Sequence, residues 1–374
     1  MAETLGNMVN AVALSSDGTK IAGASFYYPY SGTASLNTHG IYGTYFFDNN
    51  GNMLWKDEFT GDEGVYAVDV SQDGRIVASG GLLSGGKYGT PPSKGFFRIF
   101  DSSTGSVLFS KDDLPSRVNS IKLSATGDKV VLSTARELIV FDVKNRISAT
   151  PVTLINTGSD IEAVDISSVG NWCICSDSTR NDGIVYLIDI SNLSNPVLYT
   201  SPSVNAKHLI TCDLSKGSDY FVAGGDNSIL LFSKANIASF GPLSEYNPST
   251  GSTSKAVRWV CISNDGKTVA AVINKKKAGI LLILSNKNNK LKLSKKYSLG
   301  FNPNYVGMNQ DSTKIVVADG YPDSCPGTFY LFDFKNKVIK TSNTSKMNWP
   351  ICIIDNGSLL SGGSDDGSIY CFQG

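Results

Sequence analysis

The stretch Ala67 to Gly81, AVDVSQDGRIVASGG, decides the fold. An apolar run ends at Ser71, a tight turn follows at Gln72-Asp73-Gly74, and a second apolar run leads into a pair of glycines. An Asp-Gly turn between two apolar runs is a strong short-range signal for a β-hairpin. We therefore expect two antiparallel strands here.

Seven more stretches of the same design begin at Ala11, Ser120, Ala163, Thr211, Trp259, Tyr305 and Pro350. Their turns recur at steps of 43 to 56 residues, a period typical of propellers and solenoids. Each hairpin is followed by a third apolar run, which mostly ends in an acidic residue, and then by a fourth run. We predict an all-β fold: one eight-bladed β-propeller domain over residues 1–374, built of four-stranded antiparallel blades that start near residues 9, 65, 118, 161, 208, 257, 304 and 349.

The last repeat ends at GSIYCFQG, directly after its third strand. We expect residues around Glu3 to Leu5 to supply the missing outermost strand by pairing with the last blade, which would close the ring. The alternative is a frayed N-terminus beside a three-stranded last blade.

In two repeats the third strand ends in Asp and a Thr-Gly or Asn-Gly turn follows: Asp101 with Thr104 and Gly105, and Asp48 with Asn50 and Gly51. This pattern, with the repeats over essentially the whole chain, resembles the WD-repeat superfamily and its branches of YVTN or PQQ-like character. The chain departs from the eukaryotic pattern, because no repeat has the Trp-Asp pair and the only histidines are His39 and His208. The buried His–Asp bridge of that superfamily is therefore not expected, and blade rigidity has to come from packing.

The composition is that of one compact body with little surface charge. Charged residues make up 18% of the chain, below the usual quarter, and hydrophobic residues 41%. The 33 basic and 33 acidic side chains cancel, so we expect no overall field that attracts nucleic acid or an anionic membrane. No apolar run is long enough to span a bilayer, and no secretory leader opens the chain. We expect a cytoplasmic protein, or alternatively an exported one whose leader was removed.

The seven cysteines are an odd number, and several lie inside predicted strands, as Cys173 and Cys175 do. Strand spacing brings no further metal ligands to that pair. We interpret the cysteines as small buried hydrophobes and expect no disulfide framework, metal or cofactor.

Long insertions are expected to gather on one rim, opposite the tight hairpin turns. Binding residues concentrate in long loops on a rigid scaffold, and aromatic and Arg side chains carry most of the energy of protein interfaces. The predicted partner-binding residues of this rim and of the adjoining channel mouth are Tyr27, Tyr28, Tyr30, Tyr66, Lys87, Tyr88, Arg180, Arg258, Tyr321 and Trp349. The alternative is that the tyrosines near residue 28 only cover the edges of blades.

Four polar residues occupy one equivalent position of the first strands: Asp69, Lys122, Asp165 and Asp213. Because their apolar neighbours claim the core, we predict that these side chains line the central channel. They are interpreted as hydrated, paired charges; a bound cation or small ligand is the alternative.

Catalytic patterns are weak in this sequence. Gly81 to Lys87 has the spacing of a phosphate-binding loop, but Tyr88 follows in place of Ser or Thr and Pro91-Pro92 forbid the helix. No nucleophile elbow occurs, and His39 and His208 are interpreted as surface residues. The four tryptophans lie at non-equivalent positions, so a quinone cofactor is not implied.

Two classes of function remain open. The first is a non-catalytic scaffold that binds a protein or peptide on the rim and channel mouth. The second is a small-molecule binder or enzyme that uses the channel, of lactonase-like or quinoprotein-like type. The rim aromatics favour the scaffold, and an exported, surface-attached propeller is a weaker alternative.

Overall fold

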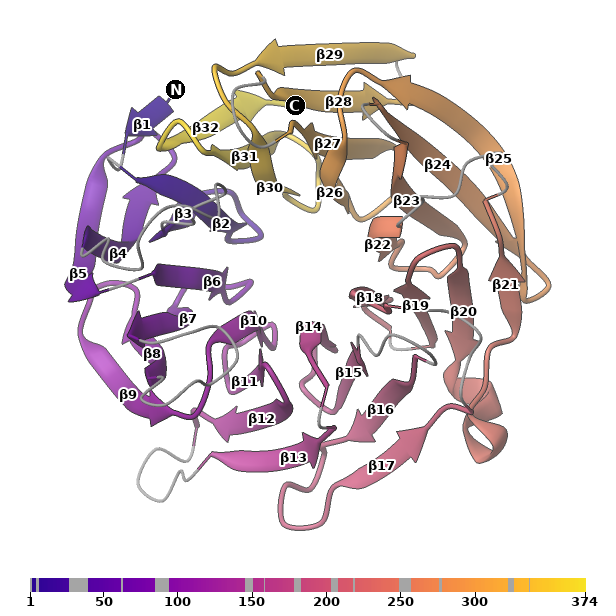
Figure 1. Ribbon diagram of the computed structural model, residues 1–374, viewed down its shortest axis with the longest axis horizontal. Helices are drawn as coiled ribbons and strands as arrows, with labels where there is room; N and C mark the ends of the chain where they lie inside the picture. The colour runs from indigo at the N-terminus through magenta and orange to yellow at the C-terminus, as the bar shows by residue number, and fades with distance from the viewer. Residues whose placement is uncertain are drawn as a thin grey trace.

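Antiparallel sheets are arranged around a central axis (Figure 1). The structure is a computed structural model that describes residues 2–4, 7–26, 40–61, 63–84, 94–144, 151–157, 159–177, 183–202, 208–217, 219–248, 257–275, 278–321, 326–335 and 337–374. Six sheets have four strands each, and one has eight. The eight-stranded sheet consists of two four-stranded parts joined by a single residue pair, Phe26 with Gly64. We refer to each four-stranded part as a unit and number the units along the chain.

The first four units run from the innermost to the outermost strand in chain order. Unit 1 consists of β2 (Met8–Leu14), β3 (Lys20–Phe26), β4 (Gly40–Asp48) and β5 (Met53–Gly61). Unit 2 consists of β6 (Gly64–Val70), β7 (Ile76–Ser84), β8 (Lys94–Asp101) and β9 (Val107–Leu114). Unit 3 consists of β10 (Val118–Leu123), β11 (Lys129–Thr134), β12 (Glu137–Asp142) and β13 (Val152–Asn156). Unit 4 consists of β14 (Ile161–Ile166), β15 (Trp172–Asp177), β16 (Val185–Asp189) and β17 (Val197–Thr200).

The next three units repeat this order, and the last one combines both ends of the chain. Unit 5 consists of β18 (Thr211–Leu214), β19 (Tyr220–Gly224), β20 (Ile229–Ser233) and β21 (Ser244–Tyr246), with the short helix η1 (Lys234–Ser239) before β21. Unit 6 consists of β22 (Val257–Ile262), β23 (Thr268–Lys275), β24 (Ala278–Lys287) and β25 (Lys290–Leu299). Unit 7 consists of β26 (Pro303–Met308), β27 (Lys314–Asp319), β28 (Thr328–Asp333) and β29 (Val338–Asn343). Unit 8 consists of β30 (Asn348–Ile353), β31 (Leu359–Ser364), β32 (Ser368–Gln373) and β1 (Ala2–Thr4).

Strand β1 is the outermost strand of unit 8. It pairs antiparallel with β32, with Ala2 opposite Tyr370 and Thr4 opposite Ser368. The beginning of the chain therefore completes the sheet that the end of the chain leaves with three strands (Figure 1).

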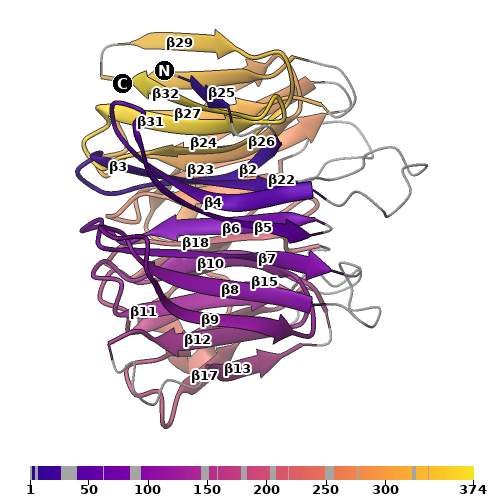
Figure 2. The ribbon, with the colours of Figure 1, turned by 90° about the vertical axis from the view of Figure 1, so that its left-hand side faces the viewer.

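The hydrophobic core lies between neighbouring units, which stack face to face (Figure 2). Some strands alternate apolar and polar residues and others are continuous apolar runs. Both faces of each sheet therefore carry apolar side chains. Phe97 of unit 2 and Phe141 of unit 3, for example, share one cluster, and their ring centroids are 6.0 Å apart. Unit 8 packs on unit 1 in the same way, where Ile369 shares a cluster with Val9 and Phe47.

A serine at the end of the first strand organises the hairpin turn in most units. In unit 2 the fully buried Ser71 Oγ accepts from the Ile76 N–H (3.0 Å) and donates to Asp73 Oδ1 (2.7 Å). Gly74 follows in the left-handed region, φ 71°, which glycine adopts without steric cost. Serines equivalent to Ser71 accept from the N–H five residues later in five other units: Ser15, Ser124, Ser167, Ser215 and Ser263.

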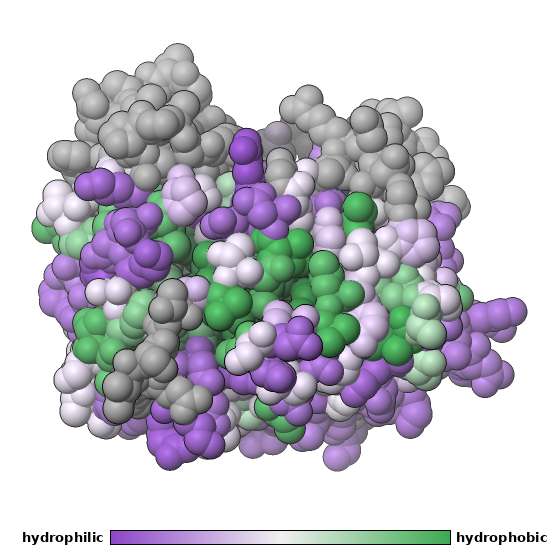
Figure 3. Space-filling view, turned by 90° about the horizontal axis from the view of Figure 1, so that it is seen from below, coloured by the Kyte–Doolittle hydropathy of each residue, from purple (hydrophilic) through white to green (hydrophobic). Residues whose placement is uncertain are grey.

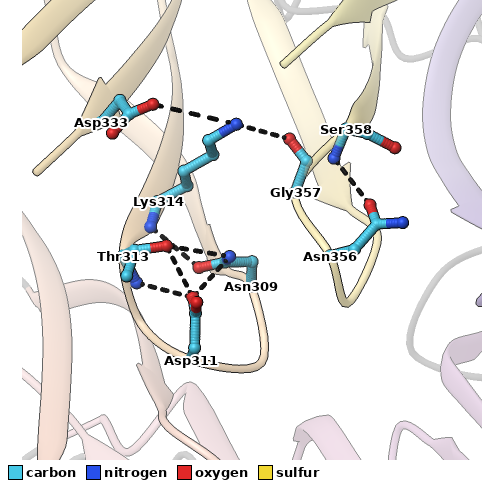
Figure 4. A network of polar contacts seen from close by, with 8 residues as sticks. All are labelled: Asn309, Asp311, Thr313, Lys314, Asp333, Asn356, Gly357 and Ser358. Atoms are coloured by element: carbon cyan, nitrogen blue, oxygen red, sulfur yellow. Dashed lines mark hydrogen bonds and ion pairs between the residues drawn. The ribbon is translucent and has the colours of Figure 1, made fainter. Parts of the chain in front are cut away.

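Unit 7 builds the same turn with different residues (Figure 4). Asn309 Oδ1 takes the place of the serine and accepts from the Lys314 N–H at 2.8 Å, while Ser312 adopts φ 55° where other units have glycine. The Lys314 ammonium reaches the Gly357 carbonyl of unit 8 (3.1 Å) and lies 3.8 Å from Asp333. The turns of neighbouring units are thus linked, and we call the face that carries them the lower face.

The outer wall differs from unit to unit. Figure 3 shows the side formed by the ring's β13 and β17 edge, where hydrophobic side chains gather in the middle of the wall between hydrophilic ones. Val197 and Leu198 of β17 are among its exposed apolar residues. Among the described residues, no helix has the length and apolar character needed to cross a bilayer.

Candidate functional site

The innermost strands place the four predicted channel residues close together inside the ring. Three of these carboxylates bind the backbone of the next unit. Asp69 Oδ2 accepts from the Leu123 N–H (2.8 Å), Asp165 Oδ2 from Leu214 (3.0 Å) and Asp213 Oδ2 from Ile262 (2.7 Å). Each aspartate therefore fastens its own first strand to the neighbouring first strand, a role that sequence spacing did not reveal.

Lys122 supplies the positive charge among these carboxylates. Burial disfavours its charged form, but Asp69, Asp165, Asp213 and the hydroxyl of Tyr305 raise its pKa. Burial also raises the pKa of Asp165 and, more strongly, that of Asp213, and the two carboxyl groups share a hydrogen bond. Because two carboxylates in contact disfavour the loss of both protons, the Asp165 carboxylate contributes to the raised pKa of Asp213.

Two aromatic residues of the innermost strands stack on each other, two positions before the equivalents of these charged residues. Trp259 of unit 6 and Tyr305 of unit 7 stack with ring centroids 4.1 Å apart. Burial raises the pKa of Tyr305 to about 12. This pair was not predicted, although both residues occupy the same position of their first strands and so could have been expected to meet.

The upper mouth of the channel is centred on Arg258, which comes from β22 of unit 6. Its guanidinium lies 6.0 Å from the centroid of the Trp349 ring of unit 8 and within electrostatic reach of Glu162 of unit 4. Because groups from two units to either side act on it, this guanidinium projects into the ring. Burial lowers the pKa of Arg258, Glu162 offsets this in part, and the buried Nε has no hydrogen-bond partner among the described residues.

Tyr66, another predicted anchor of this mouth, is covered by its neighbours. It is 9% exposed, its hydroxyl donates to Glu63 Oε2 (3.0 Å), and the Arg117 guanidinium lies 3.8 Å from its ring centroid. Phe26 packs edge-on against the same ring. Little of the Tyr66 ring is therefore accessible to a partner.

Asparagines at this level of the first strands join neighbouring units. Asn10 Nδ2 donates to the Tyr66 carbonyl (2.7 Å), Asn119 to Ile161 (3.1 Å) and Asn304 to Asn348 (2.7 Å). These three side chains therefore connect the walls of the channel mouth.

Of the remaining predicted rim residues, the structure describes one. Tyr321 is described and is 48% exposed. The others lie outside the described residues: Tyr27, Tyr28, Tyr30, Lys87, Tyr88 and Arg180.

The lower mouth is bridged by an ion pair that no sequence pattern indicated. Lys216, in the turn of unit 5, contacts Asp355, in the turn of unit 8. Ser16 of unit 1 also donates to Asp355, at 3.4 Å.

The sequence matches no family model and no curated protein. Solved structures do match. Sqt1 from Chaetomium thermophilum aligns with a TM-score of 0.73 over 98% of this chain and 95% of that chain, at 11% identity. The WD40 repeats of RRP9 align with a TM-score of 0.60 over 84% and 89%, at 13% identity. The β-propeller domain of Cps50 (Swd1) from Myceliophteria thermophila aligns with a TM-score of 0.61 over 83% and 97%, at 14% identity.

The chain has a WD40-like β-propeller fold. The predicted resemblance to WD-repeat proteins is therefore confirmed at the level of the fold. In this WD40-like propeller, whose repeats lack the Trp-Asp pair, serines hold the hairpin turns within units and aspartates of the first strands join neighbouring units.

The described part of this propeller holds no group of three or more His, Cys, Asp or Glu side chains arranged for a metal. His208 Nδ1 lies 3.1 Å from Asp226 Oδ2, and both side chains are well exposed.

Proposed function

We propose that this WD40-like propeller is a non-catalytic protein-interaction scaffold whose upper channel mouth binds a protein or peptide partner. The observation that carries the proposal is the buried guanidinium of Arg258, which lies beside the Trp349 ring and whose Nε meets no acceptor in the described part of the chain. A buried cation without a full set of acceptors is costly, and a carboxylate or carbonyl of a partner would relieve that cost.

The neighbouring surface supports the same proposal. Trp and Arg are the residue types that most often dominate binding energy, and Tyr321 adds an exposed ring to the described residues. The charges of the innermost strands act on one another, and three of the carboxylates bind backbone N–H groups of the next unit, which counts against the alternative of a small-molecule site in the channel.

We further infer that the eight units are the eight blades of one closed domain, which start near the predicted residues. The pairing of β1 with β32 and the shared core of Ile369 with Val9 support this inference. A cytoplasmic location is proposed on the free thiols of the six described cysteines, and cell fractionation tests it.

Affinity capture from the native host, quantified by mass spectrometry, tests the scaffold. Arg258→Met and Trp349→Leu should each reduce recovery of the partner at least tenfold, which is the effect of about 1.4 kcal/mol. Val169→Ser is the matched control, because Val169 is 74% exposed in the lower-face turn of unit 4. Equal recovery with all three variants, at unchanged melting temperatures, would refute binding at the upper mouth.

A further inference from the structure

Basic residues are concentrated in units 6 and 7, although the whole chain has a net charge of zero. Residues 266–346 contain fourteen lysines and four aspartates, and neither Arg nor Glu. This sector therefore has a large positive charge that the rest of the chain balances. Sequence-wide neutrality does not describe the field near this wall.

Three lysines of β25 lie on the face of unit 6 that looks toward unit 7: Lys290, Lys292 and Lys295. Lys290 pairs with Lys287, Lys292 with Ser285 and Lys295 with Ile283, and directly paired residues share a face of a sheet. Ile283 packs in the core between units 6 and 7, which identifies that face. A register shift between Lys292 and Lys295 keeps both of them on it.

Unit 7 supplies the opposite wall of this lysine-lined surface. The Lys295 ammonium lies 4.3 Å from the Phe334 ring centroid, and Tyr297 packs on Phe332 with centroids 5.0 Å apart. Ile339 of β29 pairs with Phe332 and is 54% exposed. Lys335 and Lys337 lie in the turn between β28 and β29. Strands β25 and β29 are the outermost strands of their units, on the convex outside of the ring (Figure 1).

The charges of this wall are not neutralised within the described structure. None of its exposed lysines forms an ion pair with a described carboxylate: Lys287, Lys290, Lys292, Lys295, Lys335 and Lys337. Asp333, the acidic residue at the end of β28, is buried and lies 3.8 Å from Lys314 on the lower face. Elsewhere exposed lysines do have partners, as Lys56 has Glu58 at 2.7 Å.

We propose that this wall, which we call the basic wall and define by these six lysines, binds single-stranded nucleic acid through its phosphates. Lys is depleted in protein interfaces but is a main contact of nucleic-acid phosphates. The absence of Arg from this sector fits contact with the backbone rather than bidentate recognition of bases. A flexible single strand can follow the convex wall, whereas a duplex is stiff over many turns. The exposed apolar side chains Leu293 and Ile339 are too few to insert into a membrane.

Fluorescence anisotropy of a labelled single-stranded RNA of mixed sequence tests the basic wall. The intact chain should bind it, and the logarithm of the association constant should fall linearly with the logarithm of salt concentration, with a slope of about −0.7 per phosphate contacted. Lys290→Glu, Lys292→Glu, Lys295→Glu and Lys337→Glu combined should weaken binding at least ~100-fold at low salt and flatten this slope. The control variant, with the same change at Lys56, Lys94 and Lys144, should bind within about threefold of the intact chain because these lysines lie on units 1 to 3.

Three results would overturn the proposal. The first is no binding of the intact chain at 50 mM salt, and the second is an equal loss of binding in both variants. The third is tighter binding to phosphatidylserine vesicles or to polyglutamate than to RNA, which would assign the wall to a membrane or to an acidic protein. Circular dichroism of both variants separates lost binding from lost folding. Loss at the basic wall leaves Arg258 untouched, so this test does not depend on the scaffold proposal.

Discussion

Lys216 and Asp355 form an ion pair across the lower mouth of the channel, although 139 residues separate them in the chain. They lie in the turns of units 5 and 8, so their contact bridges the ring without passing through the two units between them. Both side chains are about one-third exposed. The two side chains can meet only if the turns of units 5 and 8 lie close together, so their interaction energy tests the arrangement of the units.

A double-mutant cycle of Lys216→Ala and Asp355→Ala should give a coupling of about 0.5 kcal/mol at low salt, since partly exposed pairs contribute ~0.2–1 kcal/mol. The coupling should fall when salt is raised to 1 M, and denaturant unfolding measures it. The pair Lys267 and Asp265, within one turn and more exposed, is the control and should show less coupling. A salt-independent coupling would show that the two charges do not meet.

Asp213→Asn should stabilise the protein at pH 8. Burial raises the pKa of Asp213 in the folded state, so the native state binds a proton that the unfolded state releases near pH 4. The stability of the wild type therefore falls as the pH rises through the folded pKa of Asp213. Asparagine accepts from Ile262 and donates to Asp165 without titrating.

Thermal melts from pH 4 to pH 9 check this expectation. The difference between Asp213→Asn and wild type should grow with pH. Asp213→Ala, which leaves the Ile262 N–H without its acceptor, should be less stable than wild type throughout. A difference that shrinks with rising pH would mean that Asp213 is ionised in the folded protein.

Ser71→Ala should lower the free energy of unfolding by about 1–3 kcal/mol. The Ser71 Oγ is buried and accepts from the backbone N–H of Ile76 and of Arg75, and alanine leaves both groups without this partner. Urea denaturation measures the change, and Ser110→Ala on the exposed edge of β9 is the control. If both variants are equally stable, the Ser71 hydroxyl does not stabilise the turn.

Deletion of residues 1–4 should lower the free energy of unfolding by about 2–3 kcal/mol, because it removes the backbone pairing of β1 with β32. Glu3→Ala keeps the backbone and should change stability little. Differential scanning calorimetry measures both variants. An unaltered transition in the deletion variant would show that the sheet of unit 8 does not need β1.

The repeating hairpins were predictable because their signals are local. An Asp-Gly turn needs only a left-handed glycine, and the alternating apolar runs on either side of Gly74 or Gly266 already imply two strands with buried faces. The placement of Asp69, Lys122, Asp165 and Asp213 in the channel followed from the same period of two. Their bonds to the next unit did not, because an acceptor such as Asp69 and its donor at Leu123 belong to different repeats.

The candidate sites show the same division. The sequence by itself determined the hairpin unit, its repetition and the lysine content of residues 266–346, since each depends on neighbouring residues alone. Only the tertiary structure decided that Tyr66 is covered, that Arg258 meets Trp349, and that Lys216 meets Asp355. The physical reason is that these residues belong to distant units. Their contacts depend on how the sheets pack around one axis, and no local preference of the chain encodes such distances.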